Sequence, residues 1–135
     1  MGRSVLILID THVLVWLAFE ETRISGKAQA AINQARQAVQ GLAISDFTLY
    51  ELSLLFRKKQ FSLTITPESF LLEVETRFVV LPITSRVCVR ALSLPLRYPK
   101  DPADRIIGAT ALVEGLTLVT ADQAIRKSGV VPTVW

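Results

Sequence analysis

Residues 5–11 read VLILIDT, which is five consecutive apolar residues followed by an aspartate and a threonine. A run of this length fits one β-strand, and apolar side chains on both faces are typical of a strand buried in a parallel sheet. Asp10 and Thr11 stand where this strand ends, and open parallel sheets bind ligands beyond the carboxyl ends of their strands. The stretch therefore predicts a buried sheet with a polar site at its edge.

The same pattern, a short apolar run followed by a helix-compatible segment, recurs along the chain. Ser25 and Gly41 suit the two ends of one segment, and Asp101-Pro102 suits the start of another, which Gly115 would end. This alternation predicts an α/β fold, a three-layer α/β/α arrangement around a mostly parallel sheet of about five strands. The expected strands cover residues 5–9, 42–44, 79–83, 116–120 and 130–134, and the expected helices cover 12–20, 26–39, 46–59, 67–77, 85–94, 103–114 and 122–128.

The composition limits the classes of protein to consider. With 135 residues, 50% of them hydrophobic and 20% charged, we expect one ordered domain over residues 1–135. The mean hydropathy of +0.41 invites a membrane interpretation. However, the apolar run stops at Asp10, far short of the ~20 residues that a spanning helix needs, and a signal-peptide pattern is missing. We therefore expect a cytoplasmic protein with no membrane partner.

A single cysteine and a single histidine exclude several kinds of site. One cysteine excludes an internal disulfide framework and a cysteine-rich zinc site, and one histidine excludes a multi-histidine metal site. Cys88, between Val87 and Val89, is expected to be a small buried side chain. Any metal site in this chain has to be built mainly from oxygen ligands.

Acidic and hydroxyl side chains follow three of the expected strands. They are Asp10 with Thr11, Ser45 with Asp46, and Thr120 with Asp122. If these strands are neighbours, two or three carboxylates meet at one edge of the sheet, where they repel one another. Mg²⁺ or Mn²⁺ would remove that cost because both ions prefer oxygen ligands.

Two more acids come from expected helices. Glu51 interrupts an apolar stripe, and Asp104 shares a helix face with small and apolar residues, so both would point towards the sheet. Simpler roles remain open for each acid. Asp10 can close a turn, Asp101 and Asp122 can cap helices, Asp104 can favour the helix dipole, and Glu51 can face solvent.

Four blocks, taken in order, resemble the PIN-domain ribonucleases, and more closely the VapC-like toxins of bacterial toxin–antitoxin pairs. They are Ile9-Asp10-Thr11-His12, SDFTLYE at 45–51, DPADRIIGATA at 101–111 and GLTLVTAD at 115–122. The resemblance spans essentially the whole chain. It implies a metal-dependent endoribonuclease that holds Mg²⁺ or Mn²⁺ on Asp10, Glu51, Asp104 and Asp122, with Thr11, Ser45 and Thr120 in support. Asp46 and Asp101 would be outer acids, although Asp46 can also be a helix cap.

The resemblance also implies partners: an RNA substrate, an antitoxin protein and a second copy of the chain. Basic residues available for RNA phosphates are Arg57, Lys58, Lys59, Lys100 and Arg105, with Arg97 and the pair Arg126 and Lys127 as further candidates. The net charge of +3 permits such a partner. Clusters of this kind can equally be solvated helix ends.

Other enzyme classes fit poorly. A haloacid-dehalogenase phosphatase needs an aspartate where this chain has His12, a receiver domain needs paired acids, and neither a glycine-rich phosphate loop nor a GxSxG motif occurs. The remaining alternative is a catalytically inactive PIN-like module that binds RNA or protein. Metal-dependent RNA cleavage distinguishes the two.

Overall fold

The fold, seen in a computed structural model, is built on a five-stranded sheet in which every strand pair is parallel. The structure describes residues 6–38, 41–58 and 64–135. The strand order is β3-β2-β1-β4-β5, so β1 lies between β2 and β4. The three strands that end in acidic and hydroxyl residues are therefore neighbours, as the predicted site at the sheet edge requires. The strands are β1 (Ile7–Ile9), β2 (Leu42–Ser45), β3 (Val79–Leu81), β4 (Leu118–Val119) and β5 (Thr133–Val134).

Seven α-helices, all within the described ranges, connect or flank these strands, and each begins at a Ser, Thr or Asp whose side chain accepts a backbone N–H. Such caps satisfy donors that the first turn leaves free, which explains why the helix starts were easy to predict. A short 3₁₀ turn at Glu21–Arg23 was not predicted. The helices are α1 (Thr11–Phe19), α2 (Gly26–Arg36), α3 (Asp46–Arg57), α4 (Pro67–Arg77), α5 (Ser85–Leu92), α6 (Pro102–Glu114) and α7 (Gln123–Ser128).

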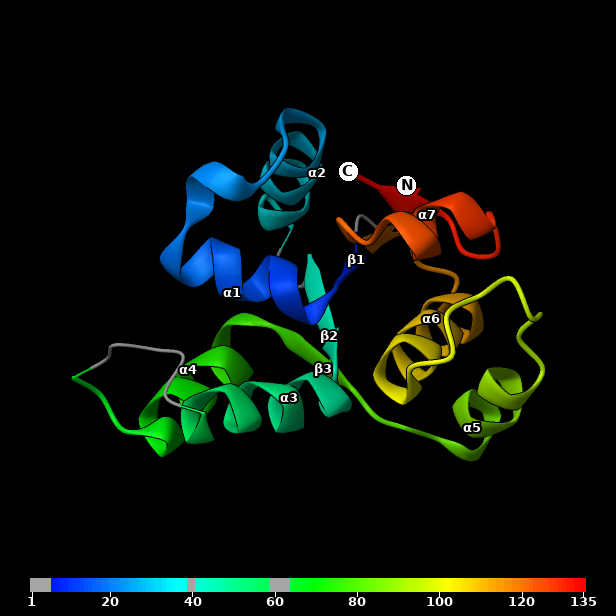
Figure 1. Cartoon of the computed structure of the whole chain (residues 1–135). Helices are drawn as coiled ribbons and strands as arrows, with labels where there is room; N and C mark the ends of the chain where they lie inside the picture. Colours follow the sequence, from blue (N-terminus) through cyan, green and yellow to red (C-terminus); the bar gives the residue numbers. More distant parts are fainter. Residues whose placement is uncertain (1–5, 39–40, 59–63) are drawn as a thin grey trace.

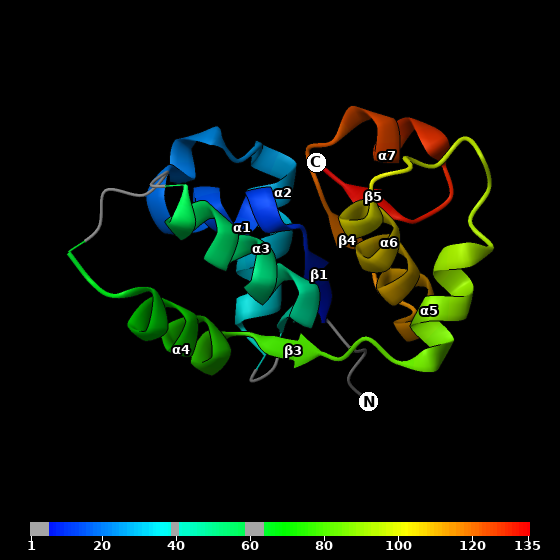
Figure 2. The same ribbon diagram turned by 60° about the horizontal axis from the view of Figure 1, so that its bottom comes forward.

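Helices cover both faces of the sheet, which confirms the predicted three-layer arrangement (Figure 1). Helices α1 to α4 lie on one side of the strands and α5 to α7 on the other (Figure 2). The side chains of each strand alternate between two cores. Ile9, Ile44 and Val119 pack towards α1–α4, whereas their neighbours Leu8, Ala43 and Leu118 pack towards α6 and α7.

Several predicted boundaries were wrong. Four strands are shorter than predicted, whereas β2 extends one residue further, to Ser45. Pro82, which has no N–H to donate, follows the end of β3. Val5, the predicted start of the first strand, lies outside the described residues. Gly41 does not end α2, which stops at Arg36. Instead, Gly41 passes so close to α2 that a Cβ there would lie 1.6 Å from the carbonyl oxygen of Ala35.

Cys88 is exposed rather than buried, which corrects the sequence prediction. It lies on α5, where successive side chains point about 100° apart because an α-helix has 3.6 residues per turn. Val87 faces the core and is buried, whereas Cys88 and Val89 turn away from it. None of the helices among the described residues has the length and apolar character needed to cross a bilayer.

Candidate functional site

Asp10 lies at the carboxyl end of β1, at the centre of the sheet. Its backbone N–H donates to the carbonyl of Val119 in β4, so the residue is fixed beside the neighbouring strand. Its side chain is 7% exposed, and both carboxylate oxygens accept hydrogen bonds. Oδ1 accepts from the Thr11 N–H at 2.9 Å and Oδ2 accepts from the Thr120 hydroxyl at 2.7 Å. Asp10 is therefore held from two sides, once by the start of α1 and once by the end of β4.

Glu51 comes from the second turn of α3 and is half-buried, as the interrupted apolar stripe predicted. Its Oε1 accepts a 2.6 Å hydrogen bond from the Thr11 hydroxyl. The same hydroxyl lies 3.0 Å from the hydroxyl of Thr48, one turn earlier on α3. Glu51 is thus attached to α1 through Thr11, the residue that follows Asp10.

Asp122 and Thr120 follow β4. The Thr120 hydroxyl donates to Asp10 and also accepts the backbone N–H of Asp122 at 3.1 Å. The Asp122 carboxylate accepts the N–H of Ile125 and so caps α7. Asp122 therefore caps α7 and also lies near Asp10, because the Thr120 hydroxyl contacts both residues.

Asp104 lies in the first turn of α6, whose N-cap is Asp101. The Asp101 carboxylate accepts the N–H groups of Ala103 and Asp104, which is the capping role that the sequence left open. The backbone carbonyl of Asp104 accepts a 2.7 Å hydrogen bond from the buried hydroxyl of Tyr98. Burial raises the pKa of that phenol. A fixed helix start therefore presents the Asp104 side chain.

The carboxylates of Asp10, Glu51, Asp104 and Asp122 are called the acidic site below. Burial and neighbouring charges change the pKa of three of them, Asp10, Glu51 and Asp104. Burial, followed by the charges of Asp10, Asp101, Asp122 and Glu51, raises the pKa of Asp104 to about 7. Burial also raises the pKa of Asp10, against the hydrogen bond from Thr120. For Glu51 burial again raises the pKa, while the hydrogen bond from Thr11 opposes it. The fold thus gathers like charges that an added cation would stabilise.

The donor set of the acidic site suits a hard divalent cation, since four carboxylates from four different elements supply only oxygen. As they are placed, no three Asp, Glu, His or Cys side chains among the described residues converge closely enough to enclose an ion. The groups are nevertheless near one another, since the charges of Asp10, Glu51 and Asp122 all contribute to the raised pKa of Asp104. A cation held there would need small side-chain adjustments, or water between some carboxylates and the ion.

Ser45 and Asp46 stand at the end of β2. Ser45 is fully buried and its hydroxyl caps α3 by accepting the N–H of Phe47. Asp46 is not the cap: its Oδ2 accepts the N–H of Ile83 at 3.2 Å and joins the start of α3 to the segment after β3. The charge of Asp101 is among the causes that raise the pKa of Asp104 and of Glu51. The structure therefore brings Asp101 into electrostatic contact with the acidic site, whereas the hydrogen bond of Asp46 joins two segments of the chain.

The basic residues occupy different positions around this site. Lys100 is exposed and directly precedes Asp101. Arg105 has another partner, because its Nη1 donates to the carbonyl of Ala91 in α5 at 3.1 Å. Arg57 and Lys58 are exposed at the far end of α3, about 9 Å along the helix axis beyond Glu51. Lys59, also predicted to contact RNA, lies outside the described residues.

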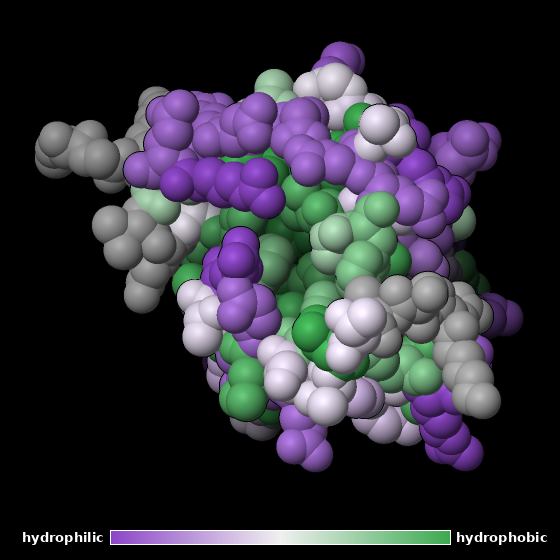
Figure 3. All heavy atoms as spheres, turned by 90° about the vertical axis from the view of Figure 1, so that its left-hand side faces the viewer, coloured by the Kyte–Doolittle hydropathy of each residue, from purple (hydrophilic) through white to green (hydrophobic). Residues whose placement is uncertain are grey.

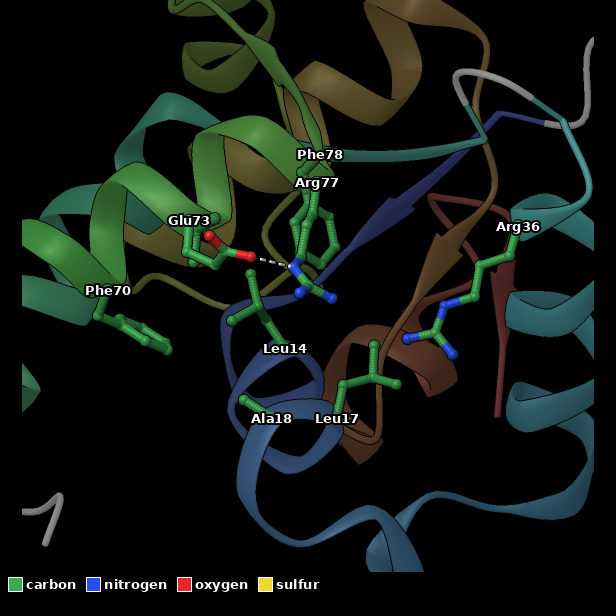
Figure 4. A pocket seen from close by; sticks show the side chains of 9 residues that line it. Leu14, Leu17, Ala18, Arg36, Phe70, Glu73, Arg77 and Phe78 are labelled. Carbon is green, nitrogen blue, oxygen red and sulfur yellow. Dashed lines mark hydrogen bonds and ion pairs between the residues drawn. The ribbon is translucent and has the colours of Figure 1, made fainter. Parts of the chain in front are cut away.

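A separate apolar groove of about 310 Å³ lies between α1, α2 and α4. Figure 3 shows hydrophobic side chains in a hollow bordered by hydrophilic ones. Arg36 and Arg77 enter it from α2 and α4, and Arg77 pairs with Glu73 at 2.7 Å (Figure 4). The residues that line the apolar groove are Leu14, Leu17, Ala18, Arg36, Phe70, Glu73, Val74, Arg77 and Phe78.

Sequence reasoning missed three residues near the acidic site. They are Thr48, buried against Thr11; Tyr98, which holds the start of α6; and His12, whose charge opposes the burial that raises the pKa of Asp10 and Glu51. A hydroxyl at helical spacing before Glu51 was the only available signal for Thr48. Nothing local marks Tyr98, because its partner depends on how two segments pack.

Comparison with known proteins gives consistent results. The PIN domain family matches residues 7–130. Ribonuclease VapC22 of Mycobacterium tuberculosis (strain ATCC 25618 / H37Rv) is 36% identical over 121 residues, which are 90% of each chain.

Two solved structures have the same fold. A chain of VapBC2 from Rickettsia felis, bound to a DNA fragment from their promoter, has a TM-score of 0.71 at 15% identity. A chain of DNA-bound VapBC from Salmonella typhimurium has a TM-score of 0.68 at 19% identity. In both cases the match covers 95% of this chain and 96% of the other.

Proposed function

Since this chain belongs to the PIN-domain family, in its VapC branch of ribonuclease toxins, we propose that it hydrolyses RNA phosphodiester bonds with Mg²⁺ or Mn²⁺ as cofactor. The observation that carries the proposal is the acidic site itself. Four of the twelve acids in the sequence come together there from α3, α6 and the ends of β1 and β4. Burial, followed by the charges of Asp10, Asp101, Asp122 and Glu51, raises the pKa of Asp104 to about 7. A protein gains nothing in stability from such crowding without a cation to neutralise it.

Asp10, Glu51, Asp104 and Asp122 would hold the ion, directly or through water. When bound there, the ion supplies Lewis acidity, which activates water and offsets the charge of the phosphodiester. Each oxygen of Asp10 already accepts one hydrogen bond and, as a carboxylate oxygen, can accept another interaction. Thr11 and Thr120 therefore orient Asp10 and Glu51 without saturating them. This route needs no histidine as general base, which agrees with a chain that has only one.

Cleavage assays with purified protein test the proposal. We expect cellular RNA to be cut in the presence of Mg²⁺ or Mn²⁺, and the activity to disappear with EDTA and in Asp10→Asn and Asp104→Asn. Glu68→Gln, an exposed acid in the first turn of α4, is the control and should cleave normally. If the wild type neither cuts RNA nor binds either ion in calorimetry, the inactive binding module is the better description. Sequencing the RNA ends left after induced expression would identify the target.

We further propose that the apolar groove receives a segment of the cognate antitoxin. Its apolar floor suits the hydrophobic face of a helix, and Arg36 and Arg77, balanced only by Glu73 within the lining, suit an acidic residue of that segment. Structures with a similar fold were solved as toxin–antitoxin complexes.

Blocking the groove tests this assignment. Ala18 lies exposed in the groove, so Ala18→Arg should fill it, weaken antitoxin binding and leave RNA cleavage intact. Ala124→Arg, at another exposed alanine, on α7, is the matched control. Unchanged antitoxin affinity in Ala18→Arg, measured by calorimetry, would place the antitoxin elsewhere.

We also propose that the chain forms a homodimer. The candidate surface is the outer side of α5 and the turn after it, where Val89, Leu92 and Leu96 are 66%, 86% and 88% exposed. Large apolar side chains this exposed and this close together are typical of an interface. Analytical ultracentrifugation should give a dimer for the wild type and a monomer for Leu92→Asp. A monomeric wild type at high concentration would contradict the proposal.

A further inference from the structure

Thr48 is a fully buried polar residue for which the reaction described above has no stated use. Its hydroxyl lies 3.0 Å from that of Thr11, which in turn donates to Glu51 Oε1 at 2.6 Å. Thr48 stands three residues before Glu51, so the two side chains share one face of α3. The three residues form a hydrogen-bonded chain from α3 to α1 and back to α3.

The number of protons fixes the direction of this chain. Each threonine hydroxyl has one proton to donate, and an ionised carboxylate only accepts. Glu51 has to be ionised to hold a cation, so the single proton of Thr11 is directed to Glu51. The contact between the two hydroxyls then uses the proton of Thr48. The order of donation is therefore Thr48 to Thr11 to Glu51.

We propose that Thr48 is a positioning residue for the acidic site, acting on Glu51 through Thr11. The inference rests on the proposed function. Donation from Thr48 holds the Thr11 hydroxyl in the rotamer that faces Glu51. It also polarises the Thr11 O–H group, which strengthens the hydrogen bond from Thr11 to Glu51. The fixed pair keeps the Glu51 carboxylate on the side of Asp10, which would otherwise depend on a flexible side chain with three rotatable bonds.

Removing the hydroxyl while keeping the side-chain shape tests the role. Hydrogen-bond partners behind metal ligands typically contribute 10–100-fold to metal affinity. We expect Thr48→Val to weaken Mn²⁺ binding about tenfold in calorimetry of the RNA-free protein, at the low end of that range. Thr48→Ser restores the donor and should bind Mn²⁺ like the wild type. Melting curves in EDTA verify that each variant is folded.

The chain offers a matched control. Thr110 is also fully buried in a helix, and its hydroxyl donates to the carbonyl of Ile106 at 2.7 Å. Thr110→Val therefore removes one buried hydroxyl by the same substitution, away from the Thr11–Glu51 contact. Its Mn²⁺ affinity should equal that of the wild type. A loss as large as that in Thr48→Val would mean that any buried hydroxyl matters, and would overturn the proposal.

A double-mutant cycle with Thr11→Val separates positioning from packing. If Thr48 acts through Thr11, Thr48→Val should cause no further loss of Mn²⁺ affinity once Thr11→Val is present. Equal losses in both backgrounds would show a packing effect and contradict the inference. If Thr48→Val does not fold, the comparison of Thr48→Ala with Thr48→Ser replaces it.

The outcomes also distinguish this inference from the proposed function. A wild type that binds Mn²⁺ and cuts RNA, with Thr48→Val binding Mn²⁺ equally well, overturns the positioning role alone. A wild type that binds no Mn²⁺ overturns both. Loss of Mn²⁺ affinity in Thr48→Val, with recovery in Thr48→Ser, supports the inference through a measurement that does not depend on cleavage.

Discussion

The acids of the site are held in different ways at the level of single residues. Asp10 accepts hydrogen bonds from Thr11 and Thr120, and these favour its charged form against burial. Within the described chain, the Asp104 carboxylate has no such donor, and burial, together with the carboxylates around it, raises its pKa to about 7. The ionisation of Asp104 therefore depends strongly on an added cation.

This difference predicts how metal-free stability changes with pH. The pKa of Asp104 is about 7 in the folded protein and near 3.8 in the unfolded chain, so between these values the folded state binds the extra proton. The free energy of unfolding in EDTA should therefore fall as the pH rises from 5 to 8. Thermal melts across this range measure the slope, and Asp104→Asn should reduce it.

The slope should not vanish in Asp104→Asn, because burial also raises the pKa of Asp10 and Glu51. Glu68→Gln, an exposed acid on α4, should keep the slope of the wild type. A metal-free protein that becomes more stable from pH 5 to 8 would contradict the prediction.

Residues of the acidic site were predictable where a strand end or a helical period placed them. Asp10 and Asp122 follow apolar runs, and Glu51 breaks an apolar stripe, so each has a local signal. Thr48 has only a weak signal, a hydroxyl at helical spacing before Glu51, because its role depends on α1 crossing α3 at Thr11. Cys88 was misjudged because neighbouring valines say little about burial in a helix, where adjacent residues face different directions.

At the level of elements, α6 is locked to the segment before it. Tyr98 is 1% exposed, and its hydroxyl donates to the Asp104 carbonyl. Its ring lies against Gly108, which is one helical turn after Asp104 on α6. A Cβ at Gly108 would lie 2.1 Å from the Tyr98 hydroxyl oxygen. The glycine thus leaves room for the tyrosine that fixes the helix start carrying Asp104.

Gly108→Ala should therefore destabilise the protein although alanine is the better helix former. Overpacking a buried contact typically costs about 1–3 kcal/mol of stability, whereas replacing glycine by alanine in a helix gains ~1 kcal/mol. With a Cβ as close to Tyr98 as this one, we expect the cost of overpacking to be the larger. Gly26→Ala on α2 is the matched control, since nothing lies within 4 Å of a Cβ there. Urea unfolding should show a loss for Gly108→Ala only. Equal stability of both variants would mean that Tyr98 moves aside freely.

Elements as a whole were more predictable than their packing. Capping side chains and the alternation of strands and helices indicated each helix and the parallel sheet. The role of Gly41 was missed because its reason is a close approach to Ala35 and not a helix end. The apolar groove was also missed, since it exists only where α1, α2 and α4 leave a gap between them.

For the whole molecule, the modest net charge of +3 conceals a separation of charge. Setting aside the four carboxylates of the acidic site leaves +3 + 4 = +7 on the rest of the chain. Lys100 lies next to Asp101 at the start of α6, whereas Arg36 lies near the starts of β2 and β3, at the opposite end of the strands. Phosphates reaching the acidic site should therefore meet Lys100 and not Arg36.

RNA binding should accordingly weaken with salt, and the two residues should differ in their contribution. Using Asp10→Asn to prevent cleavage, we expect Lys100→Ala to lower the slope of log affinity against log salt by about 1. Arg36→Ala should leave that slope unchanged. Fluorescence anisotropy over a series of NaCl concentrations measures it, and equal slopes for all three proteins would remove Lys100 from the RNA surface.

The order of the strands has a consequence for the protein during its synthesis. Asp10 emerges from the ribosome early, but the strand that fixes its backbone is β4, and the hydroxyl that holds its Oδ2 belongs to Thr120. Asp122, the last carboxylate of the site along the chain, follows Asp10 by 112 residues. A ribosome that has not yet added Asp122 therefore carries no assembled acidic site. Helices α1, α2 and α4, which line the apolar groove, have all been synthesised by then, so the surface offered to an inhibitor is made before the site is complete.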